Sequence, residues 1–480
     1  MRKAVITLIS ILAVGCTSPY YPSIDRPSTE VPDHANSQII DYIDKRLEEE
    51  YYWLDEVMDK SGSFNRTLHW EQYLTNSLQR LETNTDDGYV NSKGKRVLYS
   101  YIRDISNTRA TQTTGFGITL HYSILVMGEN RLGFAIENVY QGSPAQEADI
   151  RRGDIILSVN GTQIDYDNYA TLFNSIEYNT ATELRLMLQR QTATSANDAT
   201  LMATIKRGQY DDSPVAYHDV ITINGSDKRI GYLVYNSFKA EYDDTLLAAL
   251  GELAAEGVDS FILDLRNNGG GNVESAVKLC SALLGAEYKD ATLCELRRNP
   301  LNKSGLGNTP CKLEDVGFGL NMRELTVICS NYSASASELL ITGLRGLNIP
   351  VTLIGSTTEG KNCGMDVTRR TINGTYVEYA PITFMCYNAV GFGEWGEGLT
   401  PDIDLTEANS IGVSDEHYPI PRAAWGDLSH DIGLAAAVAS VTGKKVGTAD
   451  VEISRLSSKS LPTIELTRPF EGIRYDVPEE

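Results

Sequence analysis

The sequence predicts a multidomain protein of the α/β class, in which an α/β core follows a small β domain and an N-terminal helical subdomain. Three observations support this expectation. Strand and helix patterns alternate between residues 230 and 355, short strands and turns fill 111–161, and apolar residues recur at helical spacing after residue 39. A chain of 480 residues is also too long for one hydrophobic core, so two or three domains are expected.

The composition is that of a globular protein with an acidic surface. Hydrophobic residues make up 41% and charged residues 22%, and the formal net charge is -22. No basic stripe occurs, which argues against a nucleic-acid partner. The sequence contains no CxxC, HxH or HxxxH pattern, so neither a metal site nor another cofactor is expected.

The first 16 residues have the features of a secretory signal. A short positive segment, residues 1–3, precedes an apolar run over residues 4–15 that is too short to span a bilayer comfortably. The stretch 12–16 resembles a bacterial lipobox, in which Cys16 is acylated, although Leu12 lies one place further from the cysteine than is usual. An ordinary signal peptide with an incidental Cys16 is the alternative. We therefore expect an exported protein held at a membrane by a lipid anchor, with residues 17–38 as a polar tether.

Without Cys16, six cysteines remain that could pair in an oxidising envelope. They are Cys280, Cys294, Cys311, Cys329, Cys363 and Cys386. Three of them lie in apolar runs, where a free cysteine acts as a small core residue. At most one or two disulfides are expected, with Cys294 and Cys311 as candidates.

Residues 39–110 are expected to form a small helical subdomain. Ile39, Ile40, Ile43 and Leu47 recur at helical spacing, and the aromatic stretch 51–54 continues that apolar face. We assign these aromatic residues to the core of the subdomain rather than to a binding site.

A β domain is expected over residues 111–212. Strands at 115–120 and 132–136 precede a turn with one helical turn at 142–148, and a strand with an Asn-Gly hairpin signal follows at 151–161. This order resembles a PDZ domain of the type found in bacterial proteases. The resemblance implies that backbone N–H groups of Gly115, Phe116 and Gly117 bind the C-terminal carboxylate of a peptide, which adds a strand to the sheet. The alternative is a hairpin whose glycines serve turn geometry alone.

The α/β core is expected over residues 213–445. A strand at 261–265 runs into the glycine-rich turn 266–271, and a helix follows at 274–284. Such a turn at a helix N-terminus presents backbone N–H groups to negative charge. It lacks the Lys of a nucleotide P-loop and the spacing of a dinucleotide fingerprint.

Further along, an apolar strand at 325–329 leads into a serine-rich run, 330–338, and a helix. A second strand, 351–355, precedes Gly360 and Lys361, and Gly-Leu-Thr-Pro-Asp follows at 398–402. Together with Asp-Leu-Arg-Asn-Asn-Gly-Gly-Gly at 264–271, these segments resemble the C-terminal processing, or tail-specific, serine peptidases. The resemblance implies a crotonase-like ββα core.

The same resemblance implies the roles of the site residues. Ser335 is the nucleophile and Lys361 the general base, which burial must hold neutral if it is to take the serine proton. The N–H groups of Ala336 and Gly271, with Gly270 as the second choice, form the oxyanion hole. The alternatives without a catalytic role are that the serines of the run only cap a helix and that Lys361 is a solvated surface residue.

One position departs from the family pattern. Many of these peptidases have a Gln four residues after the Lys, and here that residue is Met365, which cannot donate a hydrogen bond. Asn362 and Glu359 are candidates to orient Lys361 instead. No His lies near either motif in the sequence, although a His brought close in space, as in the related tricorn-type peptidases, is a minor alternative.

The expected function is therefore a serine endopeptidase that cleaves unfolded or C-terminally recognised envelope polypeptides. A catalytically impaired peptide-binding protein is the main alternative, and a crotonase-like acyl-CoA enzyme leaves the PDZ-like segment unexplained. The polar, Pro-containing residues 446–480 are expected to form a C-terminal tail.

Overall fold

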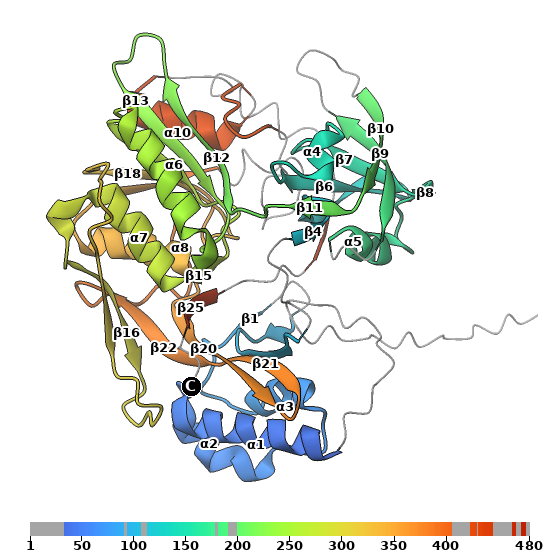
Figure 1. Cartoon of the computed structure of the whole chain (residues 1–480), viewed down its shortest axis with the longest axis vertical. Coiled ribbons are helices and arrows are strands. Elements are labelled where there is room, and N and C mark those ends of the chain that lie inside the picture. Colours follow the sequence, from blue (N-terminus) through green and yellow to red (C-terminus); the bar gives the residue numbers. More distant parts are fainter. Residues whose placement is uncertain are drawn as a thin grey trace, which may run out of the picture.

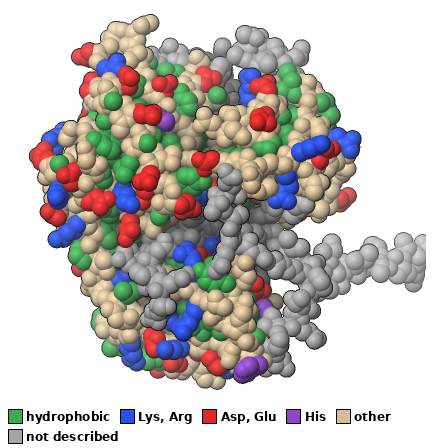
Figure 2. Space-filling model, viewed as in Figure 1, with side chains coloured by type: hydrophobic (Ala, Val, Ile, Leu, Met, Phe, Trp, Pro, Cys, Tyr) green, Lys and Arg blue, Asp and Glu red, His purple; other side chains and the backbone are tan. Residues whose placement is uncertain are grey.

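The computed structural model describes most of the chain, in three parts (Figure 1). The described residues are 33–90, 94–106, 113–177, 181–190, 199–405, 423–429, 431–444, 463–466 and 472–476. A helical part lies at the bottom of the view, a β domain at the upper right, and an α/β part at the upper left. On the face in Figure 2, acidic and basic side chains are interspersed.

The α/β part is built on a six-stranded sheet with the order β12-β13-β14-β18-β19-β23. Only β12 and β13 pair antiparallel; the other neighbours are parallel. The strands are β12 (Val215–Thr222), β13 (Arg229–Tyr235), β14 (Ser260–Asp264), β18 (Leu325–Cys329), β19 (Val351–Gly355) and β23 (Ile403–Asp404). The helices are α6 (Asp243–Ala255), α7 (Val273–Leu284), α8 (Ala336–Gly346) and α10 (Ile432–Thr442). The strands and helices expected from the apolar pattern are confirmed here.

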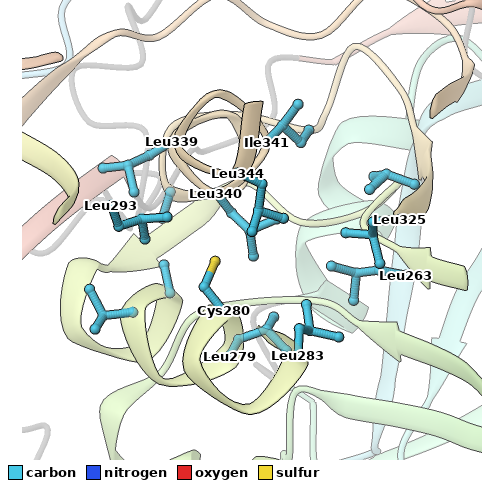
Figure 3. Close-up of a cluster of buried hydrophobic side chains, with 14 of the residues drawn as sticks. Leu263, Leu279, Cys280, Leu283, Leu293, Leu325, Leu339, Leu340, Ile341 and Leu344 are labelled. Carbon is cyan, nitrogen blue, oxygen red and sulfur yellow. The ribbon is translucent and has the colours of Figure 1, made fainter. Parts of the chain in front are cut away.

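Both faces of this sheet are covered, which explains the continuous apolar strands in the sequence. On one face α6, α7 and α8 contribute to a single cluster, in which Leu279 and Leu283 of α7 and Leu340 of α8 pack with Leu263 of β14 (Figure 3). On the other face, α10 packs against alternate residues such as Ile262.

A second sheet contains the segments that follow the glycine-rich turn and Lys361. Its order is β15-β25-β20-β22-β16-β17, and β21 pairs with both β20 and β3. The strands are β3 (Tyr101–Asp104), β15 (Gly270–Asn272), β16 (Thr292–Arg298), β17 (Thr309–Lys312), β20 (Cys363–Ile372), β21 (Thr375–Ala380), β22 (Ile382–Asn388) and β25 (Gly472–Asp476). β25 belongs to the expected tail, yet it pairs in parallel with β15 and β20, so this part of the tail is a strand of the sheet.

The N-terminal part shares its core with the second sheet. It contains α1 (Asp33–Glu50), α2 (Leu54–Lys60), η1 (Ser61–Ser63), α3 (Trp70–Leu78), β1 (Tyr89–Val90) and β2 (Arg96–Val97). Ile39, Ile43 and Leu47 of α1 pack in one cluster with Met365 and Val367 of β20. Where a helical subdomain was expected, residues 79–90 and 94–106 form turns, loops and short strands, and β3 pairs with β21.

The β domain is a sheet of seven strands, with β8 beside β7 in the path β10-β9-β7-β6-β5-β24. Its elements are β5 (Ile118–Gly128), β6 (Arg131–Val139), α4 (Pro144–Glu147), β7 (Ile155–Val159), β8 (Thr162–Gln163), α5 (Tyr169–Glu177), β9 (Glu183–Arg190), β10 (Ala199–Lys206) and β24 (Thr463–Glu465). β4 (Thr113–Gly115) pairs separately with β11 (Gly208–Tyr210). β24, also from the expected tail, adds antiparallel to the edge of β5.

The six cysteines of the described residues are all free and buried, so the expectation of one or two disulfides is not met there. Cys294 and Cys311 do face each other across β16 and β17, and the Cys311 thiol donates to the Thr309 carbonyl at 3.9 Å. Cys16, the lipobox and the signal segment lie outside the described residues. Within the described residues, no helix has the length and hydropathy needed to cross a membrane.

Candidate active site

Ser335 lies where the loop after β18 meets the first turn of α8. It is the N-cap residue of that helix and has φ 65° and ψ −114°, a strained conformation for a residue with a side chain. The residue is fully buried, and its Oγ has no hydrogen-bond partner among the described residues. Strain of this kind is characteristic of residues held for function.

The neighbouring serines of the run have structural roles. Ser333 Oγ donates to the carbonyl of Leu265 at 2.8 Å, and Ser337 Oγ donates to that of Asn268 at 2.9 Å. These bonds fasten the serine loop to the end of β14 and the glycine-rich turn. Of the three serines 333, 335 and 337, Ser335 is the one whose hydroxyl is left available for another partner.

The glycine-rich turn lies directly against Ser335. A Cβ placed on Gly270 would lie 2.7 Å from the Ser335 Cβ and 3.1 Å from the Ala336 nitrogen. Gly270 has φ 105° and Gly271 has φ 136°, so both positions favour glycine. The Gly270 N–H donates to Asn268 Oδ1 at 2.9 Å, and Gly271 pairs with Ile473 of β25.

A buried ion-pair network lies at Arg266, the first residue of this turn. The Arg266 guanidinium donates to Asp264 at 2.7–3.0 Å and to Asp431 of the α10 N-cap at 3.0 Å. Tyr232 Oη donates to Asp264 at 2.8 Å. Burial acts to raise the pKa of Asp431, but the charge of Arg266 outweighs it and the pKa lies below its ordinary value. A rigid base of this kind fixes the position of the glycine N–H groups.

Lys361 is brought to Ser335 by a single carboxylate, that of Glu338 on α8. Glu338 Oε2 accepts the backbone N–H groups of Ser335 (2.7 Å) and Lys361 (2.9 Å). Its Oε1 accepts the Gly360 N–H (2.7 Å) and the Thr358 hydroxyl (2.6 Å). Ser335 and Lys361, the candidate nucleophile and the candidate base, are 26 residues apart in the chain and share one oxygen atom as their backbone anchor. Sequence reasoning did not single out Glu338, although its place three residues after the N-cap Ser335 is that of a capping-box acid.

Two acidic residues shape the electrostatics of this region. Burial raises the pKa of Glu338 to about 7, while the hydrogen bonds that it accepts act in the opposite direction. Burial and then the neighbouring Glu338 raise the pKa of Glu359 to about 8. Both carboxyl groups are thus easier to protonate than an exposed glutamate, which limits the negative charge beside Lys361.

The side chain of Lys361 is only 1% exposed and lies over an aromatic ring. Its Nζ is 4.1 Å from the centroid of the Tyr99 ring, and Tyr99 comes from the N-terminal part. Met365 lies in the apolar cluster of that part, and Asn362 donates through Nδ2 to the Gly393 carbonyl at 2.8 Å. Tyr99 was missed in the sequence because nothing near residue 99 marks it as a neighbour of residue 361.

The cysteine beside Lys361 is shielded. Cys363 is fully buried and its Sγ donates to the carbonyl of Asp86 at 3.3 Å. Burial raises the pKa of its thiol to about 12, so it is present as the unreactive thiol at neutral pH.

The expected carboxylate-binding loop begins the main sheet of the β domain. Phe116 is buried in the domain core, and its carbonyl accepts the Ala145 N–H. Gly117 has φ 76°, and a Cβ there would lie 2.0 Å from the Ser143 Cβ, so close packing requires glycine. Gly115 ends β4. Close packing against Ser143 therefore accounts for the glycine at position 117.

The β domain contacts the α/β part at two points near the site. The ring of buried His121, on β5, meets Tyr332 of the serine loop edge to face, with centroids 5.9 Å apart. Arg152 stacks on Trp425 at 3.5 Å, and Arg266 lies 5.6 Å from the same ring. Of the histidines in the described residues, His121 contacts the serine loop, although it belongs to the β domain.

Comparisons with known proteins agree with this architecture. Residues 229–405 match peptidase family S41, and residues 136–190 match a PDZ domain. Both matches fall inside the spans 213–445 and 111–212 expected from the sequence.

Two relatives are each described as a probable CtpA-like serine protease. The one from Staphylococcus saprophyticus is 23% identical over 363 residues, which cover 76% of this chain and 65% of the relative. The one from Staphylococcus aureus strain RF122 is 24% identical, covering 69% and 62%. The chain therefore spans less than two thirds of the length of these relatives.

A solved structure, a putative S41 protease from Bacteroides fragilis, has the same fold. The TM-score is 0.66 at 22% identity, with 84% of this chain and 97% of that chain covered. From the two matched regions and the shared fold, we conclude that this chain contains a region similar to peptidase family S41, residues 229–405, and a region similar to a PDZ domain, residues 136–190.

Proposed function

We propose that the protein is a serine endopeptidase in which Ser335 attacks the peptide carbonyl and Lys361 is the general base. The observation that carries the proposal is the shared anchor on Glu338, which ties a strained, buried serine and a buried lysine to one carboxylate oxygen. Burial favours the neutral form of an amine, and only the neutral amine can accept the hydroxyl proton.

The reaction proceeds as acyl transfer. The Ser335 Oγ–H proton passes to Lys361 Nζ as the Oγ–C bond forms, and the carbonyl oxygen becomes an oxyanion. The N–H groups of Gly271 and Ala336 are the donors for that oxyanion, and one such donor contributes about 3 kcal/mol to transition-state stabilisation. The Lys361 ammonium then protonates the leaving amine, and water releases the acyl group.

The test of this mechanism is cleavage of an unfolded protein such as casein by the soluble mature chain. Ser335→Ala and Lys361→Ala are both expected to be inactive, whereas His121→Ala is expected to keep most of the activity. An active Lys361→Ala variant together with an inactive His121→Ala variant would identify His121, and not Lys361, as the general base. A wild-type chain that binds peptides without cleaving them would favour the peptide-binding alternative.

The expected substrates are unfolded or C-terminally recognised polypeptides of the cell envelope, presented by the PDZ domain. Support comes from the sheet edge at β5, since the chain's own β24 already pairs there, in the way a peptide adds to a PDZ domain. A peptide with a free C-terminus should bind more tightly, and be cleaved faster, than its amidated twin. Equal behaviour of the two peptides would remove the loop at Gly115, Phe116 and Gly117 as a carboxylate site.

The proposed location is the cell envelope, through acylation of Cys16. The lipobox-like sequence and the polar tether after it support this location. In fractionated cells, Cys16→Ser should move the protein from the membrane to the soluble fraction. An unchanged distribution would argue for an ordinary signal peptide.

A further inference from the structure

The aromatic ring of Tyr99 forms one wall of the space around Lys361. The Lys361 Nζ lies 4.1 Å from the ring centroid, and the Tyr99 hydroxyl donates to Glu359 Oε1 at 3.2 Å. Tyr99 is 8% exposed. One side chain thus contacts both the candidate base and the acidic residue two positions before it.

We propose that Tyr99 is a positioning residue for Lys361, with its ring holding the ammonium group and its hydroxyl fixing Glu359. The inference rests on the Ser335 and Lys361 mechanism proposed above. It also assigns a role in the active site to the N-terminal part of the chain, which lies outside the matched peptidase domain, residues 229–405.

The backbone of Tyr99 is held by a network of buried hydrogen bonds. The buried Asp87 carboxylate accepts the backbone N–H groups of Tyr99 (3.1 Å) and Ser100 (2.9 Å), and also the Ser100 hydroxyl (2.6 Å). Ser100 Oγ in turn accepts the N–H of Ile382, at the start of β22. Tyr51 Oη donates at 2.7 Å to Asp87 Oδ2, the oxygen that also accepts the Ser100 hydroxyl. The backbone of Tyr99 is therefore fixed to the sheet that follows Lys361.

The ring lies where positive charge develops. When Lys361 takes the proton of Ser335, its amine becomes an ammonium, and the negative face of an aromatic ring stabilises that cation. The hydroxyl-to-Glu359 bond fixes the ring against rotation away from Nζ. This arrangement supplies orientation to Lys361 that Met365 cannot give, because Met365 has no donor and packs in the apolar cluster.

Several titratable groups surround Lys361, and the test must allow for them. They are Glu338 from α8, Glu359 from the same loop, Cys363 from β20, Cys386 from β22 and Tyr99 itself, with Tyr89 stacked on Tyr99 and close to Glu359. Tyr99→Leu removes the ring and also the hydrogen bond to Glu359, whereas Tyr99→Phe removes that hydrogen bond alone. A change in the pH profile that occurs in Tyr99→Leu and not in Tyr99→Phe therefore reports on the ring.

The experiment compares Tyr99→Leu and Tyr99→Phe with the wild type in the full-length soluble chain. Tyr101→Leu is the matched control, because Tyr101 is as buried as Tyr99 and its hydroxyl donates to Glu378 instead, at 2.7 Å. For each variant, kcat and KM are measured on a quenched fluorescent peptide between pH 6 and pH 10, alongside the melting temperature.

In Tyr99→Leu, kcat should fall 10- to 100-fold with KM changed less than twofold. Loss of the ring also disfavours the ammonium, so the rising limb of the kcat profile should move at least half a pH unit toward acid. Tyr99→Phe keeps the ring and should lose less than threefold at its optimum, and Tyr101→Leu should keep the wild-type profile. If Tyr99→Leu does not fold, Tyr99→Met, which also lacks a ring, is read in the same way.

A wild-type kcat and pH profile in Tyr99→Leu or Tyr99→Met would overturn the inference, as would the same change in Tyr101→Leu. Lys361→Ala separates this failure from failure of the proposed function. An inactive Lys361→Ala variant beside an unaffected Tyr99→Leu variant overturns the role of Tyr99 alone. An active Lys361→Ala variant overturns the lysine mechanism and this inference with it.

Discussion

Replacing Glu338 should separate Ser335, the proposed nucleophile, from Lys361, the proposed base, and the size of the effect depends on which carboxylate oxygen is lost. In Glu338→Ala, four donors lose their acceptor: the N–H groups of Ser335, Gly360 and Lys361, and the Thr358 hydroxyl. Each buried donor left unpaired costs roughly 1–3 kcal/mol, and water entering the cavity recovers part of this. We expect a loss of about 4 kcal/mol in the free energy of unfolding.

Glu338→Gln should be milder, because glutamine keeps one carbonyl oxygen. If its NH₂ group turns toward Thr358, the hydroxyl oxygen can accept from it, and two donors, the Gly360 N–H and the Thr358 hydroxyl proton, lose their acceptor. The oxygen shared by Ser335 and Lys361 is then preserved. The expected loss is roughly 1–3 kcal/mol, with kcat reduced far less than in Glu338→Ala.

Urea unfolding gives the stability, and kcat on a quenched peptide gives the activity of the folded fraction. We expect Glu338→Ala to lose at least 100-fold in kcat at a urea concentration and temperature where it is fully folded, because a displacement of about 1 Å can cost that much. Thr358→Val is the control, since it removes a donor to Oε1 and leaves Oε2 untouched. A folded Glu338→Ala variant with wild-type kcat would refute the anchoring role.

Three further predictions follow from the same site. Ser335→Ala should abolish cleavage with a melting temperature within about 2 °C of the wild type, because its hydroxyl has no partner among the described residues; retained cleavage would remove Ser335 as nucleophile. Glu359 has a folded-state pKa of about 8 against an ordinary 4.5, so it stabilises the fold below pH 4.5 and that stability is lost as the pH rises toward 8. Relative to Glu359→Gln, the wild type should lose up to about 5 kcal/mol over this window in urea titrations, and parallel curves would contradict the raised pKa. Replacing residues 463–466 by a Gly-Ser linker removes β24 from the edge of β5 and leaves β25 in the chain, and it should tighten binding of a free C-terminal peptide in calorimetry; unchanged binding would show that peptides do not use that edge.

Much of the α/β part could be predicted because its signals are local. Runs such as 325–329 and 351–355 are apolar throughout, as strands covered on both faces must be, and they match β18 and β19. The glycine-rich turn and the serine run were recognisable because residue type, spacing and neighbouring elements all agreed. The N-terminal part was harder, since β3 is a strand only through its pairing with β21, about 275 residues away.

The sequence by itself determined the fold class, the order of the parts, and the residue types of the candidate site, because periodicity and short motifs are properties of neighbouring residues. The tertiary structure decided which serine hydroxyl is left available, which glycine N–H is already used, and which groups surround Lys361. It also placed β24 and β25 of the polar C-terminal segment in two sheets. These outcomes depend on contacts between segments far apart in the chain, where the partner and not the local pattern fixes the structure.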